Sequence, residues 1–428
     1  MTMKNPDKKS LQVDASEAGG GLYSRRRFVQ RGVAGAATLA AAGSVFAESP
    51  DSWRQQGDAF SNYGQPLEGT LGSRQQPIRW ITSNSAVTGD GVSWTPLHDL
   101  AGTITPNGLH FERHHNGVAV VDPGSWELLI NGAVGRSLAF NLDSLHRLPM
   151  VSRIAFLECG GNSNSLWHPN AVQAPAGFLH GLVSCAEWTG VRLSTLLDAV
   201  SPTDDAKWLV ADGYDSAGVT VSLPLSELPE DAMLALYQNG ETLRAENGYP
   251  ARLLIPGWEG VTNLKWLRSL TLTDRPAMTR YDTVSYTDLL KDGTVERFSF
   301  EMGVKSLITS PSPGHTIPGS GLHEISGLAW TGAGVITRVE LSADGGKSWA
   351  DAELQQPVLS KAFTRFRAAW QWDGNPAILK SRATDERGRV QPERQALIEE
   401  KGTNVYYHYN AVLAWAVAAN GSLSHVYA

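Results

Sequence analysis

Cys159 has the sequence context that most clearly indicates a functional residue. It follows the strand-like run Arg153 to Leu157 and opens the sequence Cys159-Gly160-Gly161-Asn162. Glycines directly after a strand let a backbone or a bulky ligand come close. A thiolate in such a place suits a thiophilic metal, and an exposed thiol could equally be a nucleophile. The residues alone leave three alternatives open: a metal ligand, a nucleophile and an inert buried cysteine.

The second cysteine, Cys185, lies in the apolar run Leu182 to Trp188. A buried free thiol is the ordinary interpretation of that setting. An exported protein could join its two cysteines in a disulfide, but the different settings of Cys159 and Cys185 argue against one. We therefore expect Cys185 to be structural.

The N-terminus predicts export. Ser24 to Gln30 contains three consecutive arginines, and the weakly apolar run from Gly32 to Phe46 leads to Ala47. This pattern predicts a twin-arginine signal peptide over residues 1–47 and a periplasmic protein. The run is too short to span a bilayer as a helix, so we expect no membrane span. Because the twin-arginine route carries folded proteins, an enzyme loaded with a cofactor before export is the favoured class.

Behind the signal, the pattern predicts a linker and two domains. Residues 48–90 are rich in Gly, Gln, Ser and Pro and predict an extended arm. Over residues 91–305, strand-like runs (125–130, 153–157 and 251–255) alternate with helical pieces such as 193–200, which indicates an α+β domain. Over residues 306–428 the strands 323–331, 335–342, 363–372 and 377–385 are separated by glycine-rich turns, which predicts an immunoglobulin-like β-sandwich.

The charge balance excludes some partners. The chain has 36 Lys and Arg against 43 Asp and Glu, and without residues 1–47 the balance is 29 against 40. Such an acidic protein repels nucleic acid and anionic membrane surfaces, but it suits a basic protein partner. With 42% apolar residues and 14 Trp, the chain has the composition of a folded globular protein.

Several segments together resemble the sulfite oxidase family of molybdopterin enzymes, and within it the sulfane dehydrogenase branch. The resemblance runs in order through most of residues 100–400 and is carried by Ile104 to Asn107, Phe111 to His115, Leu157 to Asn162, Gly248 to Gly257, Asn263 to Leu267 and Arg389 to Pro392. It implies a mixed α/β domain that binds a molybdenum-molybdopterin cofactor, followed by a dimerisation domain. It also implies oxygen-atom transfer to a sulfur compound.

The resemblance assigns a role to individual residues. Cys159 would bind molybdenum, while Arg113 and His115 would face the metal pocket, with Arg113 giving positive charge to an anionic substrate or to the pterin phosphate. Arg252 and Lys265 would contact the pterin, with Asn247 and Asn263 as weaker candidates. A catalytic tyrosine is expected at Tyr286, with Tyr281 as the alternative, and a substrate arginine at Arg367, with Arg365 as the alternative.

One departure from the family bears on the substrate. Enzymes that oxidise free sulfite carry a basic residue shortly after the cysteine, but this chain has Ser163-Asn164-Ser165. The absence of that cation favours a sulfur atom carried on a partner protein over free sulfite as the main substrate.

Electrons must leave the metal through another protein. The two cysteines are too far apart for a C-x-x-C-H haem site, so we expect no haem in this chain and a separate c-type cytochrome as acceptor. A homodimer within a hetero-oligomer is the expected assembly. Three alternatives stay open: a dehydrogenase acting on free sulfite, a reductase of the same fold acting on sulfoxides, and an exported binding protein without a metal.

Overall fold

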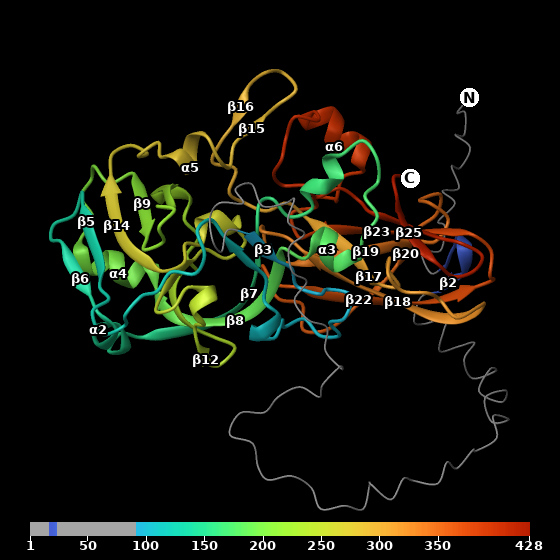
Figure 1. The fold of residues 1–428 in the computed structure, drawn as a ribbon, viewed down its shortest axis with the longest axis horizontal. Helices are drawn as coiled ribbons and strands as arrows, with labels where there is room; N and C mark the ends of the chain where they lie inside the picture. The colour runs from blue at the N-terminus through green and yellow to red at the C-terminus, as the bar shows by residue number, and fades with distance from the viewer. Residues whose placement is uncertain (1–16, 24–90) are drawn as a thin grey trace, which may run out of the picture.

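The computed structural model describes residues 17–23 and 91–428. Figure 1 shows a domain of sheets and short helices beside a β-sandwich, joined by the segment that leads from β14 (Leu267–Thr273) to β17 (Lys305–Ser310). We refer to these parts as the N-terminal and C-terminal domains. The predicted combination of an α+β domain and a β-sandwich is confirmed.

Two sheets build the N-terminal domain. The outer sheet has the strand order β10-β9-β14-β5-β6, in which only β14 and β5 run parallel. The inner sheet has the order β12-β11-β8-β7, and β13 also pairs with β11. The bounds not yet given are β5 Leu128–Gly132, β6 Leu138–Phe140, β7 Met150–Glu158, β8 Val183–Arg192, β9 Trp208–Gly213, β10 Thr220–Pro224, β11 Met233–Gln238, β12 Glu241–Thr242 and β13 Arg252–Leu254.

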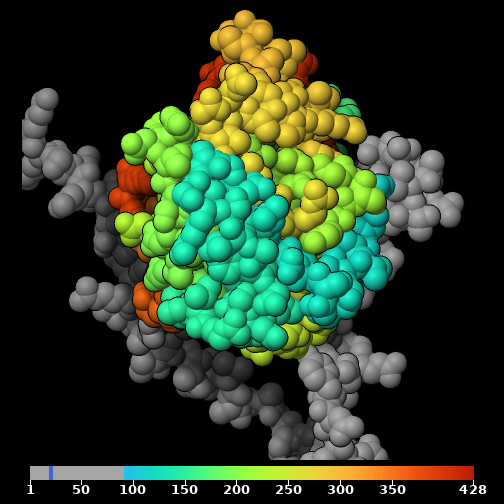
Figure 2. Space-filling view, turned by 90° about the vertical axis from the view of Figure 1, so that its left-hand side faces the viewer, coloured from blue at the N-terminus to red at the C-terminus, as the bar shows by residue number. Residues whose placement is uncertain are grey.

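Short helices and a hairpin cover this domain. The helices are α2 Leu142–His146, α3 Ala176–His180, α4 Leu193–Val200 and α5 Arg280–Thr283, and the small strand pairs are β3 Gly91–Ser93 with β4 Glu112–His114 and β15 Asp288–Leu289 with β16 Val295–Glu296. Both Figure 1 and Figure 2 show the β15–β16 hairpin projecting from the molecule, above the outer sheet in Figure 2. A capping box at Thr279 and Asp282 fixes the start of α5 just before this hairpin.

The C-terminal domain is a sandwich of two antiparallel sheets, in the orders β1-β2-β22-β18-β17 and β20-β19-β23-β24-β25. Strand β21 pairs with β22 beside the first sheet. The bounds are β18 Gly321–Trp330, β19 Ile336–Ser342, β20 Ala350–Asp351, β21 Glu353–Leu354, β22 Thr364–Trp372, β23 Ala377–Asp385, β24 Ala414–Val417 and β25 Leu423–Val426, with helix α6 at Arg394–Lys401. All four strands predicted here from alternation agree with β18, β19, β22 and β23 to within two residues.

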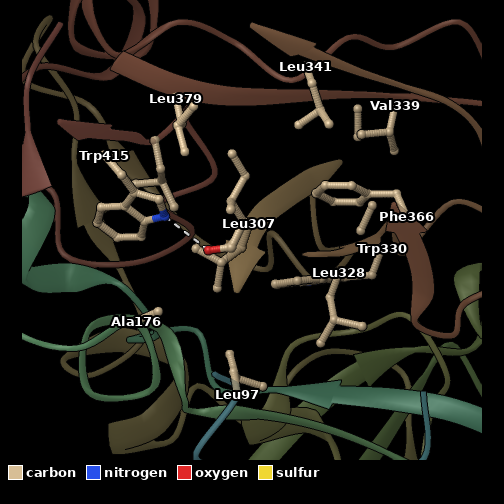
Figure 3. Packing of buried hydrophobic residues seen from close by; sticks show 14 of the residues in the cluster. Leu97, Ala176, Leu307, Leu328, Trp330, Val339, Leu341, Phe366, Leu379 and Trp415 are labelled. Atoms are coloured by element: carbon tan, nitrogen blue, oxygen red, sulfur yellow. Dashed lines mark hydrogen bonds between the residues drawn. The ribbon is translucent and has the colours of Figure 1, made fainter. Parts of the chain in front are cut away.

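The core of the sandwich continues into the N-terminal domain. Trp330, Phe366 and Trp415 fill the space between the two sheets, and the Trp415 indole N–H donates to the Ile308 carbonyl at 3.0 Å. Figure 3 shows Leu97 and Ala176, which come from the N-terminal domain, packed below the same cluster. Burial of apolar surface therefore ties the two domains together.

Residues 17–23 lie inside the predicted signal peptide and form β1 (Glu17–Ala18) and β2 (Leu22–Tyr23). β2 pairs with β22, and the buried Leu22 side chain joins the sandwich core. The arginine pair and the rest of the predicted signal, and the arm over residues 48–90, lie outside the described residues. No helix in the described part of the chain is long and apolar enough to cross a membrane.

Candidate active site

A pocket in the N-terminal domain gathers most of the predicted site residues. It offers about 760 Å³ of space, counting the open solvent at its mouth. Its lining includes eight of the residues that the sequence singled out: Arg113, His115, Cys159, Asn247, Arg252, Asn263, Lys265 and Tyr286. They come from β4, from the end of β7, from the turns on both sides of β13 and from the segment after α5, so the fold brings together residues up to 173 positions apart in sequence.

Cys159 occupies the first position after β7. Its amide donates to the Leu182 carbonyl at 2.9 Å, and its carbonyl accepts from Asn162 at 2.8 Å, so the turn that holds the thiol is fixed by backbone bonds. Gly260 packs directly on this turn, because a Cβ there would lie 3.1 Å from the Cys159 Cα. Burial raises the pKa of the Cys159 thiol to about 11, although the Arg113 cation opposes the shift. The thiol is therefore protonated at neutral pH unless a metal binds its sulfur.

Arg113, His115 and Tyr286 form a hydrogen-bonded chain along one wall. Arg113 donates to His115 Nδ1 at 3.1 Å, and His115 Nε2 lies 3.1 Å from the Tyr286 hydroxyl. Burial and the neighbouring cations lower the pKa of His115 to about 3, so the ring is neutral. Because a guanidinium only donates, Nδ1 must accept, and Nε2 carries the hydrogen that goes to Tyr286. The hydrogen of the Tyr286 hydroxyl then remains available for an acceptor in the pocket.

The remaining predicted residues differ in how far their side chains are used in hydrogen bonds within the protein. Lys265 Nζ donates to the Arg113 and Glu246 carbonyls at 3.2 and 3.1 Å and lies 2.8 Å from His114 Nδ1, so it braces the strand that carries Arg113. Asn263 uses its whole amide to hold the turn after β13. Arg252 donates to the Asn247 and Asn263 carbonyls at 2.9 and 2.8 Å, and its Nε is buried without a partner. The side-chain nitrogen of Asn247 is also buried without one.

Tyr281 and Tyr286 take different positions. Both tyrosines line a smaller cavity, but only Tyr286 of the two also lines the Cys159 pocket, and Tyr281 donates to the Ala217 carbonyl at 3.3 Å. The geometry therefore favours Tyr286 over Tyr281. Burial raises the pKa of the Tyr286 phenol well above its usual range, so the group stays protonated.

The arginine expected to face the substrate, Arg367 or its alternative Arg365, lies outside the pocket lining in this structure. Arg365 donates to the Leu100 and Gly102 carbonyls, and Arg367 pairs with Glu324 at 2.5 Å. Neither residue is among those that line the pocket. Both lie on β22, and hydrogen bonds to the carbonyls of residues 100–102 hold the two side chains against that segment.

Other residues of the site have no signal in the sequence. Tyr407 stacks on Tyr286 at 5.1 Å between ring centroids, and its hydroxyl accepts from the Tyr286 amide at 3.0 Å. Tyr406 packs edge-on against Tyr407 and is 51% exposed. The segment before β24 thus brings aromatic rings to the rim of a pocket that belongs to the other domain.

A second cluster behind Cys159 was also not predicted. Glu158 and Lys305 form a buried ion pair at 3.0 Å, with both side chains only 2% exposed. Glu158 also accepts from Asn162 at 2.9 Å and from the Trp330 indole at 2.6 Å, while Lys305 donates to Ser163 at 2.8 Å. Ser163 lies 2.7 Å from His180 Nδ1. We call these six residues the interdomain network, because Lys305 and Trp330 come from the C-terminal domain.

The two cysteines are both free. Cys185 lies on β8 opposite Phe156 of β7 and is fully buried in the apolar core, where burial raises its pKa to about 12. It is not among the residues that line the pocket.

The fold and the site together define a two-domain protein whose pocket presents one thiol, several cations and unpaired buried donors. Residues 115–281 match the model of the oxidoreductase molybdopterin-binding domain, and residues 296–414 match that of the Mo-co oxidoreductase dimerisation domain. The chicken sulfite oxidase is 30% identical over 69% of this chain and 69% of its own length. The chain belongs to the sulfite oxidase family.

Two further likenesses refine the comparison. Mitochondrial sulfite oxidase from mouse is 30% identical over 69% of this chain, which spans 59% of that protein's length. The solved structure of the sulfane dehydrogenase SoxCD from Paracoccus pantotrophus has a chain that is 40% identical, with a TM-score of 0.86 over 90% of this chain and 98% of that one. The fold of this chain is thus matched almost completely by a sulfane dehydrogenase chain.

The residues present fit the cofactor that the family implies. Cys159 offers the soft ligand that molybdenum prefers. Arg252 and Asn247 aim unpaired buried donors at the pocket, as an anionic pterin requires. Within residues 17–23 and 91–428 no three His, Cys, Asp or Glu side chains gather into a metal site.

Proposed function

We propose that this protein is a periplasmic, molybdenum-dependent sulfur dehydrogenase that oxidises carrier-bound sulfane sulfur and passes electrons to a c-type cytochrome. The observation that carries the proposal is the pocket in which Cys159, Arg113 and the His115–Tyr286 pair meet. The likeness to a sulfane dehydrogenase chain over nearly its whole length supports the substrate class.

The protein's own groups would hold the cofactor, attract the substrate's negative charge and donate hydrogen bonds in the pocket. Bound at Cys159, a molybdenum-pterin cofactor would supply oxygen-atom transfer to a sulfur lone pair and a two-electron redox change. Arg113 would attract a negatively charged sulfur group, and Tyr286 would donate a hydrogen bond to an oxygen in the pocket. Arg252 and Asn247 would hold the pterin, while Lys265 keeps Arg113 in position.

The loop after Cys159 supports a carrier-bound substrate over free sulfite. Ser163, Asn164 and Ser165 are absent from the pocket lining, and Ser163 instead binds Lys305 and His180. No cation enters the pocket from this loop to hold a small dianion.

The surface next to Tyr286 supports a protein partner. Val284, at the end of α5, and Leu289 and Val295, on the β15–β16 hairpin, are 74%, 46% and 54% exposed. Tyr406 lies beside this hairpin, since its amide donates to Asp288 of β15 at 2.7 Å. Exposed apolar side chains that gather beside an active site are typical of docking surfaces. Turnover with a basic cytochrome should fall as ionic strength rises, because the protein without its predicted signal is acidic.

Metal analysis and turnover test this proposal. We expect about one molybdenum per chain and the highest kcat/KM on a persulfide-bearing carrier protein, compared with thiosulfate and sulfite, with a c-type cytochrome as acceptor. A protein without molybdenum would exclude the enzyme altogether. A preference for free sulfite would exclude only the substrate.

Export is tested separately. Replacing Arg25 and Arg26 with Lys should retain the protein in the cytoplasm, because the export receptor reads the arginine pair. Normal periplasmic accumulation of this variant would show that another signal acts.

A further inference from the structure

A second cavity lies in the C-terminal domain, between the start of α6 and the strands β24 and β25. Figure 1 shows α6 close to the C-terminal end of the chain. The cavity offers about 560 Å³ of space, counting the open solvent at its mouth. Arg394 is the one charged side chain in its lining, which also includes Tyr409, His425 and Tyr427. The site is separate from the Cys159 pocket, and the two share no lining residue.

Two buried polar atoms on this lining, Arg394 Nε and His425 Nε2, have no hydrogen-bond partner. The Tyr409 hydroxyl is also buried, and Arg394 lies close enough to donate to it, which leaves the hydrogen of the hydroxyl for another acceptor. Tyr409 and His425 are only 2% and 1% exposed. A buried polar group without a partner is costly, so these groups, which line one cavity, indicate a polar occupant.

The surrounding contacts hold these three groups in place. The Arg394 guanidinium stacks on the Tyr427 ring at 3.8 Å and donates to the Leu166 and His168 carbonyls at 3.4 and 3.2 Å. Tyr409 packs edge-on against Trp167 at 5.0 Å between centroids. Ala428, the last residue of this chain, adds its carboxylate to the lining, but Lys380 donates to that group at 3.1 Å and balances its charge. Arg394 forms no ion pair with a carboxylate among the described residues, so its positive charge is left for the occupant.

The position of the ring hydrogen on His425 determines which kind of ligand the cavity can bind. Its Nδ1 lies 3.0 Å from the Val172 carbonyl. A carbonyl can only accept, so Nδ1 carries the hydrogen and Nε2 presents a lone pair to the cavity. Burial lowers the pKa of His425, so the ring keeps this neutral form near pH 7. The site thus offers a cationic donor, a hydroxyl and one acceptor.

We propose that this cavity binds a small oxoanion that still carries a hydroxyl, hydrogen phosphate being the simplest. Two of its oxygens would accept from Arg394 Nε and Tyr409, and its hydroxyl would donate to His425 Nε2. Sulfate carries no hydrogen near pH 7 and would set a lone pair against that of His425, so the site should reject it. Buried groups that are left unpaired by the wrong ligand give strong discrimination.

This inference does not rest on the proposed function, and its test uses binding alone. Isothermal titration calorimetry of the full holoenzyme, in a chloride buffer near pH 7, compares phosphate with sulfate at equal ionic strength. We expect saturable phosphate binding with one site per chain and at least about ten-fold weaker binding of sulfate.

Three variants locate the site. Arg394→Gln should weaken phosphate binding by at least about ten-fold, since it removes a charged hydrogen bond. His425→Gln should narrow the difference between phosphate and sulfate, because an amide can donate as well as accept. Arg387→Gln is the matched control, as Arg387 is an exposed arginine of the same domain that pairs with Glu301, and it should bind phosphate like the wild type.

Each remaining outcome would overturn the proposal. Equal binding of both anions, or phosphate binding that survives in Arg394→Gln, would place the anion elsewhere, for instance at the cations of the Cys159 pocket. No binding at millimolar phosphate would mean that water alone, or a second copy of the chain, fills the cavity.

Discussion

Two buried polar regions lie beside Cys159: the interdomain network and the active-site pocket. They differ in how many of their buried polar groups have hydrogen-bond partners. In the interdomain network, both oxygens of Glu158 and the ammonium of Lys305 have partners, and His180 Nε2 is the one buried atom left without. In the pocket, Arg252 Nε and Asn247 Nδ2 have none. Because an unpaired buried donor costs roughly 1–3 kcal/mol, the first region holds the fold and the second awaits a ligand.

The charges of the two regions differ in the same way. The network pairs one carboxylate with one ammonium at 3.0 Å in a fully buried place. The pocket lining includes three cations, Arg113, Arg252 and Lys265, against two carboxylates, Asp215 and Glu246. The carboxylates act on Lys265, whereas burial alone lowers the pKa of Arg252 to about 9. Substitutions in the network should therefore change stability, and substitutions in the pocket should change cofactor retention.

The largest effect, on molybdenum content and turnover, is expected at Cys159, which lies between the two regions. Cys159→Ser should reduce the molybdenum content and turnover by more than about 100-fold, the upper end of what loss of a supporting residue around a metal costs, because a hydroxyl is a poor ligand for a soft metal site. The thermal unfolding midpoint of the cofactor-free protein should stay unchanged. Metal analysis and calorimetry measure both, and full activity in this variant would exclude Cys159 as the metal ligand.

A large effect on stability is expected from Lys305→Met. This change leaves the Glu158 charge buried without its partner, which should lower the free energy of unfolding by about 3–5 kcal/mol. The matched control is Lys361→Met: Lys361 pairs with Asp231 at 3.0 Å, but Asp231 keeps Arg153 as a second partner, so the loss should be about 1 kcal/mol or less.

Adding Glu158→Gln to Lys305→Met should restore part of the lost stability, because both charges are then gone. Denaturant titration of the three variants distinguishes these results. Equal losses for Lys305→Met and Lys361→Met would show that burial of the network pair has no special effect.

Local sequence patterns predict one of these regions and miss the other. The strand that precedes Cys159 is visible as an apolar run, and the glycines that follow it mark Cys159 as a candidate functional residue. Arg252 and Lys265 come from the resemblance of their short motifs to the sulfite oxidase family. Helix α4 and the strands of the sandwich follow equally from periodicity. Neighbouring residues determine these features, so they can be predicted from the sequence.

The interdomain network depends on contacts between distant segments. Glu158 and Lys305 are separated by 147 positions, and nothing in the run Val304 to Ser306 marks the lysine as buried. The same holds for Tyr407, which reaches Tyr286 across 121 positions. The position of Arg367 outside the pocket lining could not be predicted for the same reason, since the packing of β22 decides which way that arginine faces.

A smaller effect, on cofactor retention, is expected from the substitution Arg252→Gln in the pocket. Arg252→Gln should weaken cofactor retention by about 10–100-fold, since it removes the cationic donor whose Nε lacks a protein partner, while the backbone contacts to Asn247 and Asn263 can be partly kept by the amide. Arg268→Gln serves as the control, because Arg268 is an exposed arginine nearby that pairs with Asp212. Molybdenum and pterin content after dialysis are the measurements. Equal retention in the two variants would contradict the assignment of Arg252.

The smallest effect is expected at the other cysteine. Cys185 lies on the strand next to that of Cys159 but faces the core, away from both polar regions. The Phe363 amide lies close enough to hydrogen-bond its sulfur, so the hydroxyl of Cys185→Ser can accept from the same group. This offsets part of the cost of a buried hydroxyl, and we expect a loss of only about 1–2 kcal/mol in the free energy of unfolding. Molybdenum content and kcat should equal those of the wild type. A loss of metal from this variant would mean that the core beneath β7 also positions the Cys159 turn, and the division between a region that holds the fold and a region that holds the ligand would fail.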